Sequence, residues 1–197
     1  MLDPVEPQST EAQPPTEAAS IASKEDRLSS LRLLRDVFAA VLIAIFVIVF
    51  VYRPVKVEGT SMMPSLSDEE RIFINQFTFR FGIGDIERGD MVVFWYPLDR
   101  SKSYIKRVIG LPGESVEIEN GQVYVNNRPL QEPYLTPDYR DNSSMVRRKL
   151  GPDEFFVLGD HRSSSNDSRV WGAVDRKLIF GKAVFAYWPM DKVGTIR

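Results

Sequence analysis

The longest apolar stretch of the chain lies near its N-terminus. Residues 37–52 read VFAAVLIAIFVIVFVY, without a charged residue, glycine or proline. Leu31, Leu33 and Leu34 extend this stretch toward the roughly 20 residues that cross a hydrocarbon core of ~30 Å. A buried helix of a globular domain would show a polar stripe, whereas this stretch is apolar on all sides. We therefore predict one transmembrane anchor helix over residues 31–53.

The flanks of this stretch argue against a cleavable signal peptide and predict an orientation. A signal peptide has a shorter leader and small residues after its apolar part, whereas RPVKVEG follows here at 53–59. Basic residues are more frequent before the stretch (Arg27, Arg32, Arg35) than after it (Arg53, Lys56). This excess predicts a cytoplasmic N-terminus and an extracytoplasmic domain over residues 54–197. Residues 1–30 hold six acids, two bases and many Pro, Ser and Thr residues, which predicts a disordered cytoplasmic tail.

After the anchor, the pattern of apolar positions is typical of β-strands. Asn120-Gly121 separates two alternating segments and is the strongest short signal for a hairpin. Apart from the anchor, only one helical turn is expected, near Ser61. The sequence predicts a mainly β domain of antiparallel sheets or a distorted barrel, with strands at 55–58, 71–75, 77–81, 91–96, 104–109, 116–119, 122–125, 128–130, 155–158 and 183–188.

The amino-acid composition excludes several classes of partner, nucleophile and metal site. Apolar residues make up 43% of the 197 residues, which is enough for a buried core. With 25 Lys and Arg against 27 Asp and Glu, the net charge of −2 argues against a nucleic-acid partner. The chain has no cysteine, which excludes disulfides, thiolate-bound zinc, iron–sulfur clusters and a cysteine nucleophile. It has one histidine, His161, so a His-rich metal site is excluded and we expect neither metal nor cofactor.

Three polar segments differ from ordinary strands and loops, and the first surrounds Ser61. Residues 59–66 read GTSMMPSL. The glycine permits a tight turn, and Pro64 is tolerated in a first helical turn, so Ser61 would stand at a helix start. Free N–H groups there would face an oxyanion. On these eight residues alone, a plain N-cap is the simpler interpretation.

The second segment places Lys106 inside an otherwise apolar strand, YIKRVI at 104–109. Most lysines in strands are exposed charges on the solvated face of a sheet. A buried lysine would instead lose the solvation of its ammonium group, and its pKa would fall from about 10.4 toward neutrality. A neutral amine beside a serine hydroxyl is a competent general base.

The third segment, GDHRSSSNDSRVWG at 159–172, lies between two apolar stretches. It suits a polar surface loop without a function. It also suits a loop that supports a site through many hydrogen bonds, in which Asp167 pairs with Arg169 and a serine orients an amine.

Together, and in this order, the segments resemble type I signal peptidases, membrane-anchored Ser-Lys proteases that remove signal peptides from exported preproteins. The resemblance rests on GTSMMPSL, on GDMVVF at 89–94, on KRVIGLPGE at 106–114 and on GDHRSSSNDSR at 159–169. It covers the anchor and the chain from about Tyr52 to Trp188. It implies a mostly antiparallel β catalytic domain that rests on the membrane.

The resemblance also implies a role for individual residues. Ser61 would be the nucleophile and Lys106 the general base, while Ser165 would accept the lysine amine's hydrogen bond and orient it. Asp167 and Arg169 would form a supporting ion pair. Gly59 departs from members that have a serine there to help the oxyanion hole, so the Ser61 N–H would take a larger share of that role. His161 and Ser163-Ser164 also depart from the family's common pattern.

Cleavage after small residues, in an A-x-A pattern, requires two shallow apolar pockets. Val55 and Val57 share one face of a strand, which suits a substrate bound as an added strand. An ordinary place in the core is the alternative, favoured for Leu66. The residues expected to wall the cleft are Val55, Val57, Met62, Leu66, Tyr104 and Ile105. The expected partners are signal-peptide-bearing preproteins and a lipid bilayer, either a bacterial plasma membrane or a thylakoid membrane, and the oligomeric state is left open.

Two alternatives compete with the Ser-Lys protease. In one, His161 is the base, assisted by Asp160 or Asp167, although adjacent side chains are poorly placed to orient each other. In the other, the chain is a non-catalytic, membrane-tethered β module that binds exported chains through exposed aromatic side chains at Phe77, Phe79, Phe81, Trp95 and Tyr96.

Overall fold

The computed structural model describes residues 30–46, 52–81, 83 and 85–196. The chain divides into two compact units, Met1–Phe46 and Val47–Arg197. Almost all of the predicted tail over residues 1–30, and residues 47–51 of the predicted anchor, lie outside the described residues.

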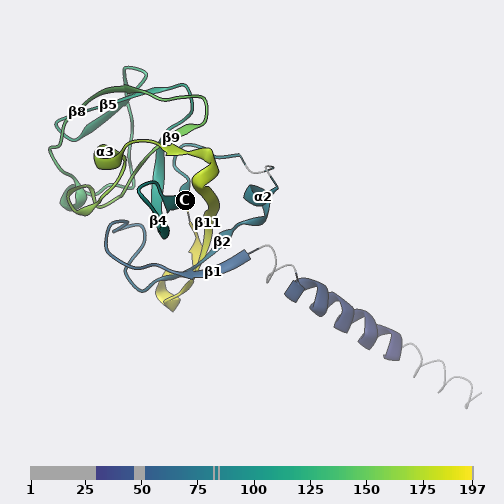
Figure 1. The fold of residues 1–197 in the computed structure, drawn as a ribbon. Coiled ribbons are helices and arrows are strands. Elements are labelled where there is room, and N and C mark those ends of the chain that lie inside the picture. The colour runs from purple at the N-terminus through teal and green to yellow at the C-terminus, as the bar shows by residue number, and fades with distance from the viewer. Residues whose placement is uncertain (1–29, 47–51, 82, 84, 197) are drawn as a thin grey trace, which may run out of the picture. The chain divides into compact units, whose positions relative to one another are not determined.

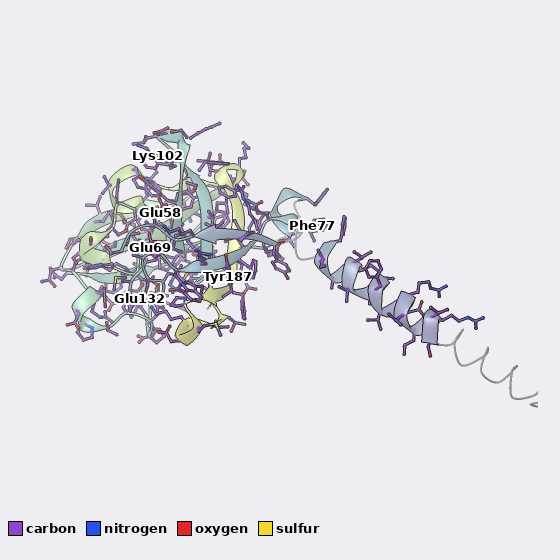
Figure 2. All side chains as sticks on the ribbon, turned by 90° about the horizontal axis from the view of Figure 1, so that it is seen from below. Glu58, Glu69, Phe77, Lys102, Glu132 and Tyr187 are labelled. Atoms are coloured by element: carbon purple, nitrogen blue, oxygen red, sulfur yellow. The ribbon has the colours of Figure 1, made fainter. Side chains whose placement is uncertain are left out.

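The described part of the first unit is one helix. Residues 30–46 are α-helical, as predicted there, and their side chains project on all sides and are exposed (Figure 2). In the described residues, no helix combines the length and the apolar character needed to cross a bilayer. The spanning role of residues 31–53 therefore stays a prediction.

The second unit is built on an antiparallel sheet of eight strands (Figure 1). Its hydrogen-bonded order is β1-β2-β11-β3-β4-β9-β10, with β12 beside β11. The strands are β1 (Tyr52–Lys56), β2 (Arg71–Asn75), β3 (Met91–Tyr96), β4 (Asp99–Gly110), β9 (Glu154–Leu158), β10 (Val174–Asp175), β11 (Ile179–Trp188) and β12 (Gly194–Thr195). This confirms the predicted mainly antiparallel β fold.

A second antiparallel sheet has the order β7-β6-β5-β8 and is formed by the chain between β4 and β9. Its strands are β5 (Ser115–Glu119), β6 (Gln122–Val125), β7 (Arg128–Pro129) and β8 (Met145–Lys149). The predicted hairpin is confirmed: β5 pairs with β6 around Asn120 and Gly121, which have φ values of 48° and 80°. Both residues accept this left-handed conformation, which a tight hairpin turn requires.

One predicted strand is wrong. Residues Phe77–Arg80 form the short helix α2 instead of continuing as a strand. Helical spacing brings the rings of Phe77 and Phe81 to 4.7 Å and leaves Phe79 to pack against buried apolar residues. The remaining short helices are α3 (Ser168–Trp171), η1 (Pro137–Tyr139), η2 (Arg162–Ser164), η3 (Arg176–Leu178) and η4 (Met190–Lys192).

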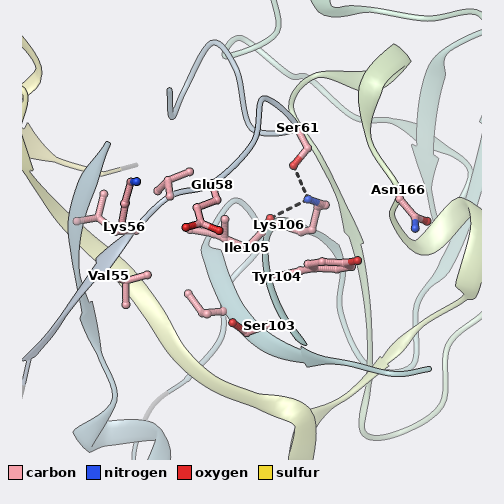
Figure 3. Close-up of a pocket in the computed structure, with 12 residues that line it drawn as sticks. Val55, Lys56, Glu58, Ser61, Ser103, Tyr104, Ile105, Lys106 and Asn166 are labelled. Carbon is pink, nitrogen blue, oxygen red and sulfur yellow. Dashed lines mark hydrogen bonds between the residues drawn. The ribbon is translucent and has the colours of Figure 1, made fainter. Parts of the chain in front are cut away.

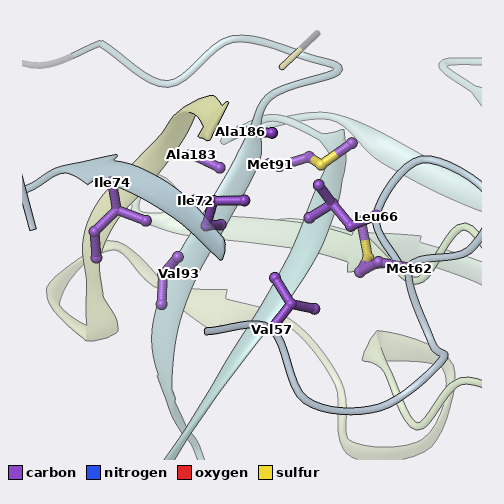
Figure 4. Close-up of a cluster of buried hydrophobic side chains, with 9 residues drawn as sticks. All are labelled: Val57, Met62, Leu66, Ile72, Ile74, Met91, Val93, Ala183 and Ala186. Carbon is purple, nitrogen blue, oxygen red and sulfur yellow. The ribbon is translucent and has the colours of Figure 1, made fainter. Parts of the chain in front are cut away.

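The apolar core lies on both faces of the large sheet. Val92 and Phe94 of β3 pack on one face and Met91 and Val93 on the other, which confirms that this continuous apolar strand is covered on both sides. A further cluster joins residues of β4 and β9 to residues of the small sheet. The cluster that concerns the site is drawn in Figure 4 and contains Val57, Met62, Leu66, Ile72, Ile74, Met91, Val93, Ala183 and Ala186.

Candidate active site

Ser61 lies in a turn between β1 and β2. The turn is closed by backbone hydrogen bonds from Met63 N–H to Thr60 O (3.1 Å) and from Leu66 N–H to Met62 O (2.9 Å). Met62 and Leu66, which follow the serine in the chain, are buried in the core and fix the turn there. The bond from Leu66 to Met62 is the i→i+4 bond of a single helical turn, as expected near Ser61, and no longer helix forms. Ser61 Oγ accepts from Lys106 Nζ and from no backbone N–H of the described residues, so the N-cap interpretation is wrong.

Lys106 lies in β4 and is 4% exposed. Its Nζ donates hydrogen bonds to Ser61 Oγ (2.6 Å) and to Ile105 O (3.0 Å), as Figure 3 shows. Burial lowers the pKa of Lys106 to about 8, although the carboxylates of Asp167 and Asp160 act in the opposite direction. Lys106 is therefore buried, as its predicted role as a base requires, and it lies beside the predicted nucleophile.

The polar loop after β9 is held by Asp167, which is fully buried. Its carboxylate accepts hydrogen bonds from Gly159 N–H (3.1 Å) and from Arg169 Nε and Nη2 (both 2.8 Å). Arg169 Nη1 in turn donates to Asp141 Oδ2 at 2.6 Å. The predicted ion pair between Asp167 and Arg169 is thus present, and the bond from Gly159 to Asp167 joins the two ends of the loop.

Ser165 does not make the hydrogen bond predicted for it. Its Oγ is buried and has no hydrogen-bond partner among the described residues. The hydroxyl lies against Gly159, where a Cβ would come within 2.2 Å of it and within 2.5 Å of Ser61 O. Lys106 Nζ is directed instead to Ser61 Oγ and Ile105 O, so Ser165 does not orient the amine in this conformation.

A pocket of about 340 Å³ adjoins the Ser61–Lys106 pair (Figure 3). Of the six residues expected to wall the cleft, four line it and two do not: Met62 and Leu66 are buried in the core, which was the favoured alternative for Leu66. The complete lining is Val55, Lys56, Val57, Glu58, Ser61, Ile72, Val93, Ser103, Tyr104, Ile105, Lys106 and Asn166.

Two apolar lining residues that the sequence did not predict are reached through strand pairing. Ile72 of β2 is the partner of Val55, and Val93 of β3 is the partner of Ile105. Cross-strand neighbours lie close together, so a correct pairing of the predicted strands would have found both residues.

Sequence reasoning also missed a buried ion pair next to the base. Arg107 donates from Nε (2.9 Å) and Nη2 (2.7 Å) to Asp160, and both side chains are almost completely buried. Successive residues of a strand point to opposite faces, so Arg107 points away from Lys106. The alternation of the strand was the only signal in the sequence. It predicts to which face the Arg107 side chain points, but it does not identify Asp160 as its partner.

His161 occupies a different place from the one its alternative role requires. Its Nδ1 lies 3.3 Å from Thr60 O, and its ring packs edge-on against Tyr139. The backbone N–H of His161 donates to Ser61 O at 3.1 Å. The side-chain contact to Ser61 Oγ is made by Lys106. In the described residues, no group of three His, Asp or Glu side chains is arranged to hold a metal ion.

Known proteins are similar to this chain over most of its length. The family model for signal peptidase, peptidase S26, matches residues 30–188. Signal peptidase I of Leptolyngbya laminosa is 34% identical over 193 residues, 93% of this chain and 91% of the relative. Signal peptidase I S of Bacillus subtilis is 35% identical over 175 residues, 84% of this chain and 92% of the relative.

A crystal structure of a signal peptidase I from Enterococcus faecalis is 28% identical, with a TM-score of 0.43, and the match covers 50% of this chain and 97% of that one. The family match and the full-length relatives agree with the resemblance found in the sequence motifs. The chain belongs to the signal peptidase family, peptidase S26.

Proposed function

We propose that this serine endopeptidase removes signal peptides from preproteins with Ser61 as nucleophile and Lys106 as general base. Membership of the signal peptidase family supports the reaction class and favours an enzyme over a non-catalytic β module. The observation that carries the assignment of residues is the 2.6 Å hydrogen bond between Ser61 Oγ and the buried Lys106 amine.

The chemistry is acyl transfer. Neutral Lys106 takes the proton of Ser61 as Oγ attacks the carbonyl carbon of the scissile peptide bond. The resulting ammonium then protonates the leaving amine, the C–N bond breaks, and an acyl-enzyme remains. Lys106 next takes a proton from water, whose oxygen attacks the ester, and returns that proton to Ser61.

The negative charge that develops on the carbonyl oxygen needs a hydrogen-bond donor. Gly59 has no side-chain hydroxyl, and its N–H is already engaged with Asp68 Oδ1 at 2.7 Å. In the described part of the chain, the Ser61 N–H donates to no acceptor. We assign the Ser61 N–H as the principal donor to the oxyanion.

The substrate binds as an extended strand in this proposal. β1 is the edge strand of the large sheet, and β9 pairs with β4 only from Arg107 onward, so residues 103–106 of β4 have an unpaired edge. The pocket lies between residues 55–58 and 103–106, and its apolar lining includes Val55, Val57 and Ile105. A short apolar lining of this kind favours small side chains, in agreement with cleavage after A-x-A.

The cellular arrangement follows from the sequence and from the family. We propose a cytoplasmic tail over residues 1–30, an anchor over residues 31–53 and an extracytoplasmic catalytic domain over residues 54–197. The domain would act at the outer surface of a bacterial plasma membrane or at a thylakoid membrane, without a cofactor.

The test is to replace each member of the pair and to assay cleavage of a preprotein. Ser61→Ala and Lys106→Ala should each lower kcat by about 10⁴-fold or more, since members of a catalytic unit lose nearly all activity individually. The chain offers a matched control, because the exposed Lys192 also contacts a serine hydroxyl, that of Ser67. Ser67→Ala and Lys192→Ala should keep wild-type activity, and wild-type turnover in Ser61→Ala would refute the proposal.

A further inference from the structure

Glu132 is a buried carboxylate in the segment that follows β7. It is 6% exposed and accepts a hydrogen bond from the Tyr134 hydroxyl at 2.7 Å. It also forms an ion pair with Arg162, which is equally buried, through both terminal nitrogens of the guanidinium. Burial, followed by the charge of Glu132, raises the pKa of Tyr134, so this hydroxyl stays a donor. Buried charges persist only when they are paired, and here each has its partner.

Arg162 connects Glu132 to the loop that packs on the nucleophile. Its Nε donates to Gly159 O (3.1 Å), and its own carbonyl accepts from Arg169 Nη2 (2.7 Å). Gly159 lies in close contact with Ser61 O, and the N–H of His161 donates to that same carbonyl at 3.1 Å. The ion pair therefore holds the loop against the backbone of Ser61.

Tyr134 connects the same segment to the strand of the base. The guanidinium carbon of Arg107 lies 4.0 Å from the centre of the Tyr134 ring, which is a favourable cation–π distance. Arg107 follows Lys106 in β4 and binds Asp160 and Gly89 O. The segment 132–134 thus contacts both halves of the site, the strand of Lys106 through Arg107 and the loop against Ser61 through Arg162.

We propose that Glu132 and Tyr134 are positioning residues that hold Ser61 and Lys106 in their reactive geometry. This inference rests on the proposed function of that pair. Neither residue lines the substrate pocket, so the segment acts on the chemical step and not on peptide binding. It also gives the small sheet a function, because the segment that follows its strand β7 contacts the large sheet through Arg107.

The inference also predicts a change in the pKa of Lys106, because this pKa depends on the surroundings of the amine. Asp167 and Asp160 act on its amine and favour the ammonium form, and Glu58 and Lys56 are charged residues of the same pocket wall. Burial outweighs the effect of Asp167 and Asp160. If the loop loosens, water reaches the amine, desolvation weakens, and the pKa of Lys106 rises toward its value in water.

The experiment measures kcat, KM and the pH profile of kcat/KM on a preprotein. Glu132→Gln should lower kcat by roughly 10- to 100-fold, since displacements of about 1 Å cost rates of this size, with KM unchanged. The midpoint of the pH profile should move upward, and Glu132→Asp should restore part of both changes. Tyr134→Phe keeps the ring over Arg107 and should have a smaller effect than Tyr134→Leu.

A paired variant separates positioning from folding. Glu132→Met combined with Arg162→Met removes both buried charges and should restore the melting temperature lost in Glu132→Gln. Its kcat should stay low. A wild-type kcat and pH midpoint in this folded variant would show that the pair is merely structural and would overturn the inference.

The matched control breaks an exposed ion pair of the same small sheet. Glu117→Gln separates Glu117 from Arg147, which are 2.8 Å apart, and should leave kcat and the pH midpoint unchanged. Loss of activity in this control to the level of Glu132→Gln would also count against a specific role for Glu132. Ser61→Ala in the same assay tests the proposed function separately, because cleavage that survives in it contradicts the catalytic pair whatever the Glu132 variants do.

Discussion

At the scale of single residues, burial distinguishes the proposed base from an ordinary lysine. Lys106 and Lys192 each contact a serine hydroxyl. The side chain of Lys192 is 37% exposed and lies 3.8 Å from the carboxylate of Glu70. Lys106 is enclosed by strand and loop, so its ammonium form loses the hydration that stabilises it. The same residue types therefore have different chemistry because their surroundings differ.

The pH dependence of cleavage follows from this burial. With a pKa of about 8, Lys106 is mainly protonated at pH 7 and cannot accept the proton of Ser61. We expect kcat/KM to rise with pH through a midpoint near 8 and to level off above it, which a pH–rate series measures. Lys106→Arg should be inactive at every pH tested, because a guanidinium stays charged. A rate that does not change between pH 6 and 10 would contradict a lysine base.

The same pKa predicts a cost in stability. The folded value of about 8 lies below the unfolded value of 10.5, so the unfolded chain binds more protons between these pH values. The destabilisation is complete below pH 8 and fades as the pH rises to 10.5. Lys106→Met should therefore be more stable than the wild type at pH 7, by up to about 3 kcal/mol. Urea unfolding at pH 7 and pH 10.5 tests this, and an equal difference at both pH values would contradict it.

At the scale of elements, the sequence predicted most of the strands but missed β8, β10 and β12, and it predicted irregular segments poorly. Alternation identified β2, β5 and β6, because their side chains face the core on one side and solvent on the other. It failed at Phe77–Arg80, where aromatic residues at every second position also satisfy the contacts of a short helix. Pro64 suggested a helical start at Ser61, and the backbone there makes a single helical turn held by Met62 and Leu66, without an N-cap bond from Ser61.

The loop after β9 depends on the absence of a side chain at Gly159. An added Cβ would meet Ser165 Oγ at 2.2 Å and Ser61 O at 2.5 Å. Gly159→Ala must therefore push the loop away from the nucleophile. We expect a loss of about 1–3 kcal/mol in the free energy of unfolding and a lower kcat. Gly194→Ala is the control, since nothing lies within 4 Å of its added Cβ, and equal effects of the two variants would refute the argument.

At the scale of the whole molecule, the site joins three segments that are far apart in the chain. The turn of Ser61, the strand of Lys106 and the loop of Asp167 were each marked by their motifs, so their residue types were predictable from the sequence. Their buried cross-links were not. The partners Arg107–Asp160 and Glu132–Arg162 lie 53 and 30 residues apart, and a single sequence carries no signal that pairs them. The sequence also could not show that Ser165 lacks its predicted hydrogen bond. This depends on the direction in which the Lys106 amine points, and the sequence does not contain that information.

The topology of the chain can be tested because it contains no cysteine. One introduced cysteine then reports its own side of the membrane to a thiol reagent that does not cross bilayers. Val146 is 87% exposed in the catalytic domain, so Val146→Cys should react in intact cells. Ser9→Cys, in the acidic tail, should react only after the cells are permeabilised. The excess of arginines before the proposed anchor predicts this pattern, whereas the reverse would place the Ser61–Lys106 pair in the cytoplasm, out of reach of exported preproteins.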